Sequence, residues 1–212
     1  MKTTLYLGTN PAHFPAVGHL VHYPVIKIVP RDAHLPELKQ AYDRLKEYTH
    51  LIFTSKNAVE TFYMHLKELG KEKTALEGKV IVAIGRVTER HLALHGVKAD
   101  IAAEEETQEG VIEALQKQNL EEAFIFLPRS SLARDALTLF LQEQGVRFLA
   151  CDLYDTLPQK LEPVPDLAHV DEIVFTSPST VDAFLQIYGR LPQHKTLLAL
   201  GPITEERLKA KV

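Results

Sequence analysis

Short apolar runs alternate along the chain with longer stretches in which apolar residues recur at helical spacing. The apolar runs are Leu5–Leu7, Val25–Val29, 51–53, 80–84, a short piece around 101, 123–127, 146–154, 172–175 and 197–200. Helical periodicity covers 36–47, 57–69, 87–95, 108–118, 131–144, 179–188 and 203–210, and a short helix is expected over roughly 11–20. Because the runs are apolar throughout rather than alternating, they are typical of strands buried in parallel sheets with helices on both faces. The pattern predicts an α/β protein.

Two strand–turn–helix motifs occur twice, in the same order. Residues 51–62 and 173–184 are identical at five of twelve positions, and so are residues 81–92 and 197–208. Unrelated strand–helix units also resemble one another, since each needs an apolar strand, a small turn and a capped helix. The shared residues here include glycine and threonine of the turns as well as apolar positions. We therefore predict an internal duplication that forms two similar parallel-sheet α/β domains.

The order of the elements predicts how these domains are assembled. The Val25–Val29 run and the extended stretch at 146–154 flank the first copy, and a proline-rich stretch at 158–165 precedes the second. We expect domain one at residues 1–30 plus 158–212 and domain two inserted at 31–157, with a two-stranded linker between them and an active-site cleft between the domains. A double crossing of this kind acts as a hinge.

The turns of the repeated motifs favour anion binding. Phe-Thr-Ser at 53–55 and 175–177 ends a strand with residues that cap the next helix, and Gly-x-x-Thr at 85–88 and 201–204 joins a turn glycine to a threonine that opens a helix. A helix N-terminus offers unpaired N–H donors and partial positive charge, which suit carboxylates or phosphates. Parallel sheets bind ligands at the carboxyl ends of their strands. Each motif alone indicates ordinary capping, whereas the paired arrangement predicts a site for an anionic ligand.

Composition narrows the classes of function. The 212 residues carry a formal net charge of −4, so no general basic field favours nucleic acid. Cys151 is the only cysteine, which excludes an intrachain disulfide and fits a reducing, cytoplasmic setting. No apolar run approaches the roughly 20 residues of a membrane span. We expect no nucleic-acid partner, no membrane partner and, without a phosphate-binding glycine loop, no nucleotide.

Two further clusters are candidates for sites. His91 and His95 have the i, i+4 spacing of a metal-chelating helix, but no third ligand is evident nearby, so an exposed helix face is preferred. The acidic run Glu104–Glu106 is expected to be a solvated loop or the approach to a helix. No metal site and no cofactor is predicted.

Several motifs in order resemble the uroporphyrinogen-III synthase family. They are Phe-Thr-Ser-x-x-x-Val at 53–59, Ala-Ile-Gly-x-x-Thr at 83–88, Leu-Pro-Arg at 127–129, Ala-Arg-x-x-Leu at 133–137, Leu-Tyr-Asp-Thr at 153–156, Phe-Thr-Ser-Pro-Ser-Thr-Val at 175–181 and Leu-Gly-Pro-x-Thr at 200–204. Tyr-Pro-Val-Ile at 23–26 resembles the family's first domain crossing. The resemblance covers nearly the whole chain.

The resemblance implies a cofactor-free lyase. The linear tetrapyrrole hydroxymethylbilane, a polycarboxylate, would lose its terminal hydroxyl as water and close to uroporphyrinogen III with inversion of its last ring through a spiro intermediate. The family's proton-donor tyrosine maps to Tyr154, whose phenol stays protonated at neutral pH. We further expect a cytoplasmic monomer that receives its substrate from hydroxymethylbilane synthase.

The resemblance also implies the substrate contacts, which are backbone N–H groups and hydroxyls at the helix starts. The expected residues are Thr54, Ser55, Lys56, Asn57, Gly85, Arg86, Thr88, Arg129, Ser130, Ser177, Ser179, Thr180, Gly201, Pro202 and Thr204. For Arg129 and Arg134, carboxylate binding and pairing with acidic side chains are equally open. Lys56 and Arg86 either supplement the N–H donors or are solvated, and Tyr154 has the alternative of a tyrosine at the rim of a linker strand.

Two departures from the family pattern keep alternatives open. The turn after the first strand, Gly8-Thr9-Asn10-Pro11, lacks the arginine that the family usually carries there. The second motif copy ends at Val212, whereas the first continues with a strand and a helix, so we expect domain one to be shortened at its C-terminal end. The alternatives are a weakly active relative, or a non-catalytic two-lobed protein that binds an anionic small molecule.

Overall fold

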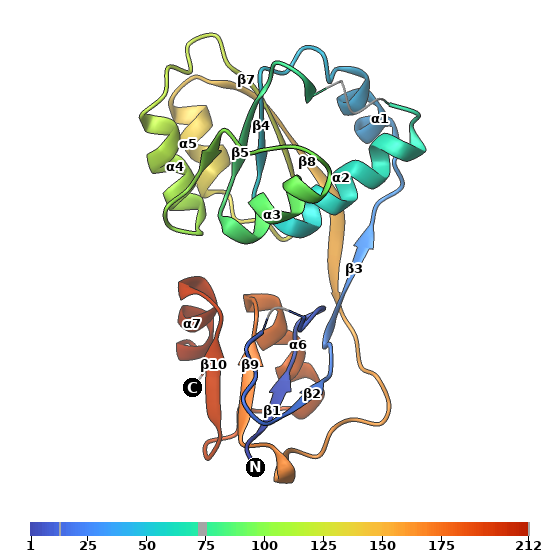
Figure 1. Ribbon diagram of the computed structural model, residues 1–212, viewed down its shortest axis with the longest axis vertical. Coiled ribbons are helices and arrows are strands. Elements are labelled where there is room, and N and C mark those ends of the chain that lie inside the picture. Colours follow the sequence, from blue (N-terminus) through green and yellow to red (C-terminus); the bar gives the residue numbers. More distant parts are fainter. Residues whose placement is uncertain (13, 72–75, 212) are drawn as a thin grey trace. The chain divides into compact units, whose positions relative to one another are not determined.

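The computed structural model describes residues 1–12, 14–71 and 76–211, which fold as two compact units. Met1–Ile28 together with Thr156–Val212 form one, here called the terminal unit, and Val29–Asp155 form the other, the inner unit. Each unit is a sheet packed with helices (Figure 1). The α/β class predicted from the apolar runs is confirmed, and most neighbouring strands are parallel. The strand at Ile26–Pro30 is the exception: it runs antiparallel to the strand at Arg147–Pro158, since the Gln159 N–H donates to the Val25 carbonyl and the Arg31 N–H to the Leu153 carbonyl.

The sheet of the inner unit has the strand order β3-β8-β7-β4-β5-β6. Its strands are β3 (Ile26–Pro30), β4 (His50–Phe53), β5 (Val80–Ala83), β6 (Ile101–Ala102), β7 (Phe124–Ser130) and β8 (Arg147–Pro158). Both β3 and β8 extend past the boundary of the inner unit into residues of the terminal unit. In the central strand β4, Leu51, Ile52 and Phe53 are all fully buried, which explains why such strands are apolar without alternation.

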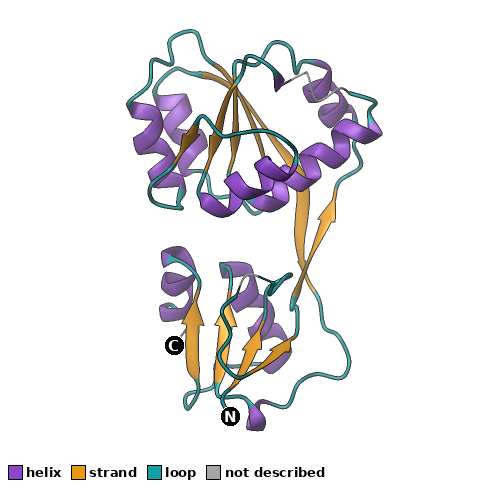
Figure 2. Ribbon diagram, viewed as in Figure 1, coloured by secondary structure: helices purple, strands orange, loops and turns teal. Residues whose placement is uncertain are grey.

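Helices cover both faces of this sheet (Figure 2). They are α1 (Pro36–Asp43), α2 (Lys56–Glu68), α3 (Arg86–Leu94), α4 (Gln108–Gln116) and α5 (Ala136–Glu143). Ile52, Val82 and Ile125 pack against α4 and α5. On the opposite face, Phe53 and Phe126 contact aromatic side chains of α1 and α2, and α3 packs beside α2. Successive residues along each strand point to opposite faces of the sheet, so they belong to two separate hydrophobic cores.

The terminal unit has the strand order β10-β9-β1-β2. Its strands are β1 (Thr3–Tyr6), β2 (His19–His22), β9 (Glu172–Phe175) and β10 (Thr196–Ala199), and its helices are α6 (Pro178–Tyr188) and α7 (Pro202–Lys209), with a short 3-10 turn at Leu167–His169. Leu5, Ile173 and Phe175 form a core with Phe184 of α6 and Leu208 of α7. The first and last parts of the chain thus share one hydrophobic core.

The two motif copies pair in the same register within their own sheets. Leu51 lies opposite Ile81 in the inner unit, and the corresponding residues Ile173 and Leu197 lie opposite each other in the terminal unit. The backbone hydrogen bond just past the end of each strand pair is also repeated. The Ile84 N–H donates to the Phe53 carbonyl at 3.0 Å, and the Leu200 N–H donates to the Phe175 carbonyl at 2.8 Å. The sequence repeat therefore corresponds to a repeated three-dimensional arrangement.

Two expected helices differ from the structure. The described part of residues 11–20 contains no helix, and its end forms strand β2, which pairs with β1. Pro15 would break a helix there, and Gly18 has a φ of 99° where a Cβ would collide with the Lys2 carbonyl, so the chain turns instead. The helix expected over 131–144 begins only at Ala136, because β7 continues to Ser130 and a turn follows.

Candidate functional site

Four helix starts follow directly on the ends of parallel strands. In the inner unit β4 leads into α2 and β5 into α3, and in the terminal unit β9 leads into α6 and β10 into α7. The N-cap residues are Ser55, Gly85, Ser177 and Gly201. All four belong to the expected substrate contacts, and each places backbone N–H groups at the carboxyl edge of its sheet.

At the start of α2, Ser55 caps the helix and also reaches a tyrosine. Its Oγ accepts a hydrogen bond from the Ala58 N–H at 3.0 Å and lies 2.8 Å from the Tyr154 Oη. Tyr154 belongs to β8, so the contact joins the helix start to a strand that lies two places away from β4 in the sheet. Lys56 and Asn57 follow in the first turn and are partly exposed, as is Thr54 before the cap.

An irregularity in the sheet places Tyr154. Strands β7 and β8 pair regularly from Phe124 to Arg129, which lies opposite Asp152, but Ser130 lies opposite Tyr154. One extra residue on β8 is accommodated in this way, and such bulges redirect a side chain relative to the pleat. The result is that Tyr154 is paired with Ser130 while its hydroxyl meets Ser55.

The Tyr154 phenol is buried and surrounded by polar groups. Only 4% of the residue is exposed. Burial raises the pKa of Tyr154 above its ordinary value of 10, and hydrogen bonds from Ser55, Ser130 and Asn57 act in the opposite direction. The phenol therefore keeps its proton at neutral pH, while partners for the corresponding phenolate are already in place.

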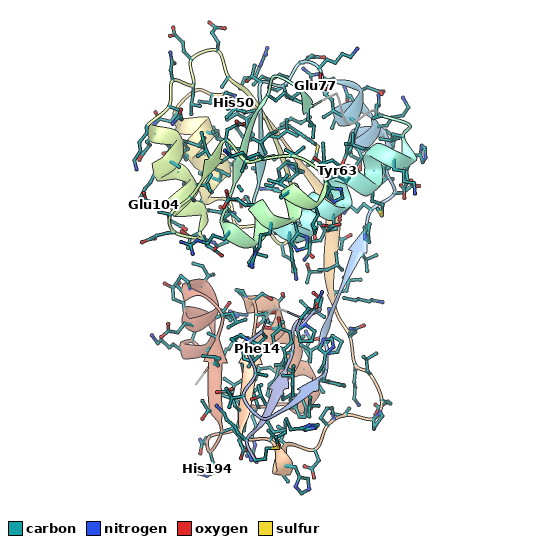
Figure 3. All side chains as sticks on the ribbon, in the orientation of Figure 1. Phe14, His50, Tyr63, Glu77, Glu104 and His194 are labelled. Carbon is teal, nitrogen blue, oxygen red and sulfur yellow. The ribbon has the colours of Figure 1, made fainter. Side chains whose placement is uncertain are left out.

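The start of α3 already binds a carboxylate. The Arg86 N–H donates to Oε1 of Glu106 at 3.0 Å, and the Glu106 side chain lies so close to Gly85 that a Cβ there would meet it. The acidic run that contains Glu106 is an exposed loop, as expected, and Glu104 of the same run is labelled in Figure 3. Within that loop, however, the Glu106 carboxylate is bound to the protein. The contact shows that this helix start accepts a carboxylate.

Further cations lie along α3 and just after it. Arg86, Arg90 and Lys98 line an open groove of about 710 Å³ in the inner unit, together with Glu89 and Ala93 of α3 and residues 96–99 that follow the helix. Thr88, by contrast, is buried at 2% exposure, so its side chain belongs to the packing of the helix.

Arg129 and Arg134, for which the sequence left two roles open, both form ion pairs with acidic side chains. Arg129 donates to Asp152 at 3.0 Å and to Asp135 at 3.4 Å. Arg134 forms a bidentate pair with Glu109 with both distances at 2.7 Å, which holds the pKa of that carboxyl at about 2. Pairing with acidic side chains is the observed state of both.

In the terminal unit, the hydroxyls of the α6 start mainly serve the cap. The Thr180 Oγ1 accepts from the N–H groups of Thr176 and Ser177 and donates to the Ser177 carbonyl at 2.7 Å. The Ser177 and Ser179 hydroxyls lie 2.8 Å apart and are partly exposed. Thr180 is fully buried, so its hydroxyl is used within the helix start.

The α7 start is shaped by glycine and proline. Gly201 has φ 106° and ψ 156°, and Pro202 takes the first helical position, where a missing N–H costs nothing. Thr204 is 3% exposed, like its buried counterpart Thr88 in the first copy. The donors that this start offers to a ligand are therefore backbone groups rather than the threonine hydroxyl.

The inner unit thus brings Tyr154, Ser55, Asn57 and Ser130 together and places Gly85 at a neighbouring strand end. Sequence reasoning missed the contact of Glu106 with the α3 start, whereas it had left the pairing of Arg129 with acidic side chains open. A sequence pattern reveals a capping carboxylate only when that residue is close to the helix start in the chain. Glu106 could not be found in this way, because Gly85, which it contacts, lies twenty-one residues earlier.

The histidine pair is held by a carboxylate. His91 and His95 lie 2.7 and 3.4 Å from the two carboxylate oxygens of Glu60 on α2, so they join α2 to α3 rather than forming a bare helix face. His95 also stacks on Tyr63, which is labelled in Figure 3. Within residues 1–12, 14–71 and 76–211, no group of three or more histidine, cysteine, aspartate or glutamate residues has a metal-binding arrangement. In the same ranges, no helix is long and apolar enough to cross a membrane.

Comparison with known proteins gives a consistent result. A family model described as "Uroporphyrinogen-III synthase HemD" matches residues 16–211. A protein of Methanothermobacter thermautotrophicus assigned as a uroporphyrinogen-III synthase is 31% identical over 211 residues, covering 92% of this chain and 81% of that protein. The uroporphyrinogen-III synthase of Chlorobaculum parvum is 27% identical over 222 residues, covering 99% of this chain and 89% of that protein.

Solved structures share the fold. A mutant uroporphyrinogen III synthase from the extremely thermophilic bacterium Thermus thermophilus aligns with a TM-score of 0.70 at 20% identity, covering 99% of this chain and 89% of that one. The uroporphyrinogen-III synthetase from Helicobacter pylori aligns with a TM-score of 0.67 at 20% identity and the same coverage.

Proposed function

Because the chain belongs to the uroporphyrinogen-III synthase family, we propose that it cyclises hydroxymethylbilane to uroporphyrinogen III, with loss of water and inversion of the last pyrrole ring. The observation that carries the mechanism is the buried Tyr154 hydroxyl at the α2 start, 2.8 Å from the Ser55 Oγ. The reaction needs one proton delivered to a poor leaving group, and this phenol is the group positioned to deliver it.

Tyr154 would act as the general acid. Burial raises the pKa of its phenol, so the proton is present throughout the neutral range. Donation to the terminal hydroxyl of the substrate allows the carbon–oxygen bond to break with both electrons leaving on oxygen, as water. The cation left on the substrate is shared with its pyrrole nitrogen, and the last ring then attacks it.

The substrate carboxylates would bind at the helix starts. Glu106 on the Arg86 N–H supports this, because it is a carboxylate of the kind the substrate carries, bound where the proposal needs one. The groove lined by Arg86, Arg90 and Lys98 adds local positive charge to a chain whose net charge is −4. The duplicated motif extends the proposal to the backbone donors near Ser177 and Gly201.

We also propose that β3 and β8 act as a two-stranded linker between the two units. The support is that these two strands are hydrogen-bonded neighbours and that each continues across the unit boundary. A cytoplasmic monomer that takes its substrate from hydroxymethylbilane synthase completes the proposal.

Isomer analysis of the product tests the function. The full chain is incubated with freshly prepared hydroxymethylbilane, and the uroporphyrinogens are oxidised and separated as isomers I and III. We expect isomer III to dominate, at a rate above the spontaneous closure that gives isomer I. Isomer I alone, formed at the spontaneous rate, would refute the enzymatic function and leave the non-catalytic binding protein.

A Tyr154→Phe variant tests the proton donor separately. We expect kcat to fall by about 10²-fold or more, the range typical of a lost general acid, with KM little changed. Lys117→Gln, at the exposed C-terminal end of α4, is a control that should match the unaltered chain. An unchanged kcat in Tyr154→Phe would remove the tyrosine from the mechanism while leaving the overall reaction intact.

A further inference from the structure

The surroundings of the Tyr154 hydroxyl contain more polar groups than orientation of one phenol requires. The Ser55 Oγ of the α2 cap lies 2.8 Å from it, and the side chains of Asn57, in the first turn of α2, and Ser130, on β7, lie near enough to lower the pKa of the phenol. They come from two different elements, and the bulge between β7 and β8 is what sets Ser130 opposite the tyrosine. Such convergence on one oxygen resembles the donor sets that stabilise a developing negative charge.

The two serines share a feature that favours donation from each hydroxyl to the phenol oxygen. The Ser55 Oγ accepts from the Ala58 N–H at 3.0 Å, and the Ser130 Oγ accepts from the Leu132 N–H at 3.2 Å. Each hydroxyl has one hydrogen, and each already uses a lone pair for a backbone donor. If each donates its hydrogen to the Tyr154 oxygen, every group is satisfied and the phenol keeps its own hydrogen for another acceptor.

The backbone bonds also strengthen this donation. An N–H bond to a hydroxyl oxygen polarises that hydroxyl, so its hydrogen becomes a better donor to the next oxygen in the chain of bonds. Asn57 supplies a further donor through its amide, which unlike a hydroxyl cannot lose its proton to the phenolate. In a site where the tyrosine is almost fully buried, such bonds are worth more than they would be in water.

We infer that Ser55, Ser130 and Asn57 are positioning residues that aim the Tyr154 proton at the substrate and then stabilise the phenolate left behind. This rests on the proposed role of Tyr154 as proton donor, and it assigns the three residues to the tyrosine instead of to the substrate carboxylates with which the sequence motifs had grouped them.

The proton balance is closed within the reaction. The Tyr154 O–H bond breaks as a new O–H bond forms on the substrate hydroxyl, and water leaves with the electron pair of the carbon–oxygen bond. The phenolate is held by the three donors while the last-ring carbon that already carries a methylene bridge joins the cation, giving the spiro intermediate. The older bridge bond of that carbon then breaks with its electrons returning to the ring, and the freed bridge carbon joins the unsubstituted carbon of the same ring. The phenolate regains a proton when that newly joined carbon loses its hydrogen, so no external acid or base is consumed.

The test compares variants that remove the donor with variants that keep it. Ser55→Ala is expected to lower kcat about tenfold or more with little change in KM, because the donor acts on the charge of the transition state. Ser55→Thr keeps both the hydroxyl and the cap and should retain most of kcat. Asn57→Asp replaces an amide donor by a carboxylate acceptor of the same shape, and we expect it to lower kcat further than Asn57→Ala.

Loss of a helix cap alone needs its own control. Thr107 caps α4 by accepting from the Gly110 N–H at 3.1 Å, and it is not one of the side chains that hydrogen-bond Tyr154. Thr107→Ala should therefore lower the denaturation midpoint about as much as Ser55→Ala does through its cap, but keep kcat. Equal kcat losses in Thr107→Ala and Ser55→Ala would mean that the effect is structural, and would overturn the inference.

A more acidic phenol distinguishes stabilisation of the phenolate from a change in packing around the tyrosine. Replacing Tyr154 by 3,5-difluorotyrosine lowers the pKa of the phenol, so it should restore kcat in the Ser55→Ala background by a larger factor than it changes kcat in the otherwise unaltered chain. No preferential restoration would overturn the stabilising role. If Tyr154→Phe itself kept full activity, the proton-donor proposal would fail first, and the two failures are thereby distinguished.

Discussion

Replacing Glu106 by glutamine should tighten substrate binding, because it weakens the hydrogen bond by which the Glu106 side chain occupies the α3 start. In the structure Oε1 of Glu106 accepts the Arg86 N–H at 3.0 Å, and the rest of the side chain lies against Gly85. If a substrate carboxylate binds the same helix start, it must first displace Glu106. Glutamine keeps the size and the contact with Gly85 but loses the charge.

The magnitude follows from the difference between a charged and a neutral hydrogen bond. Bonds to charged groups contribute about 1.5–3 kcal/mol and neutral ones about 0.5–1.5 kcal/mol, so the substitution weakens the internal contact by about 1 kcal/mol. The substrate carboxylate then displaces the internal contact at a cost lower by the same amount. About 1 kcal/mol corresponds to roughly a fivefold lower KM. We expect kcat to stay nearly constant, since the helix start acts on binding and not on the proton transfer.

The assay is the initial rate of isomer III formation over a series of hydroxymethylbilane concentrations. Glu104→Gln is the matched control, since Glu104 is an exposed residue of the same loop (Figure 3) and its replacement removes the same charge. An effect of overall charge would lower KM in both variants equally. If Glu106→Gln showed the same KM as the control, or a higher one, the α3 start would not be a substrate carboxylate site.

Two further predictions concern stability. Gly201→Ala should lower the free energy of unfolding by about 1–3 kcal/mol, since φ 106° with ψ 156° lies in a region that is open almost only to glycine; an unchanged denaturation midpoint would contradict this. Arg134→Met should cost at most about 1 kcal/mol at neutral pH, because the Arg134–Glu109 pair is exposed. The pKa of Glu109 is lowered from 4.5 to about 2, so this stabilisation is fully present above pH 4.5 and lost as the pH falls toward 2. Urea unfolding of the unaltered protein and of the Arg134→Met variant at several pH values should therefore give free energies of unfolding whose difference shrinks over that interval. A difference that stays constant would mean that the Arg134–Glu109 ion pair does not contribute this stability.

The sequence allowed prediction of those features that depend on local patterns. The strands around Leu51 and Ile173 are apolar because both faces of each sheet are covered, and that requirement is visible in a single run of residues. The helix starts after Phe53 and Phe175 were predictable because capping uses residues adjacent in the chain. The repeat then indicated that these starts belong together.

Features that depend on distant residues were not predictable in this way. Nothing around residue 106 indicates that its carboxylate bonds to the Arg86 N–H, because α3 and β6 lie between the two residues in the chain and the contact depends on how they fold back. The helix expected over 11–20 was wrong because the backbone requirements of Pro15 and Gly18 favour a turn. The bulge that sets Ser130 opposite Tyr154 depends on the pairing of two strands, which neither strand reveals alone.

Under the proposed function, the duplication accounts for anion binding and acid catalysis at helix starts of the same kind. Both copies place a serine at the cap of the first helix, Ser55 in one and Ser177 in the other, and the strands behind them pair in the same register. In the terminal unit the cap serine meets a neighbouring hydroxyl of its own helix, at Ser179. In the inner unit the long strand β8 carries Tyr154 to the cap, so the same serine meets a phenol instead. If the proposed roles hold, a single added strand residue at the bulge separates the helix start at Ser177, which would bind an anion, from the one at Ser55, which would also control a proton.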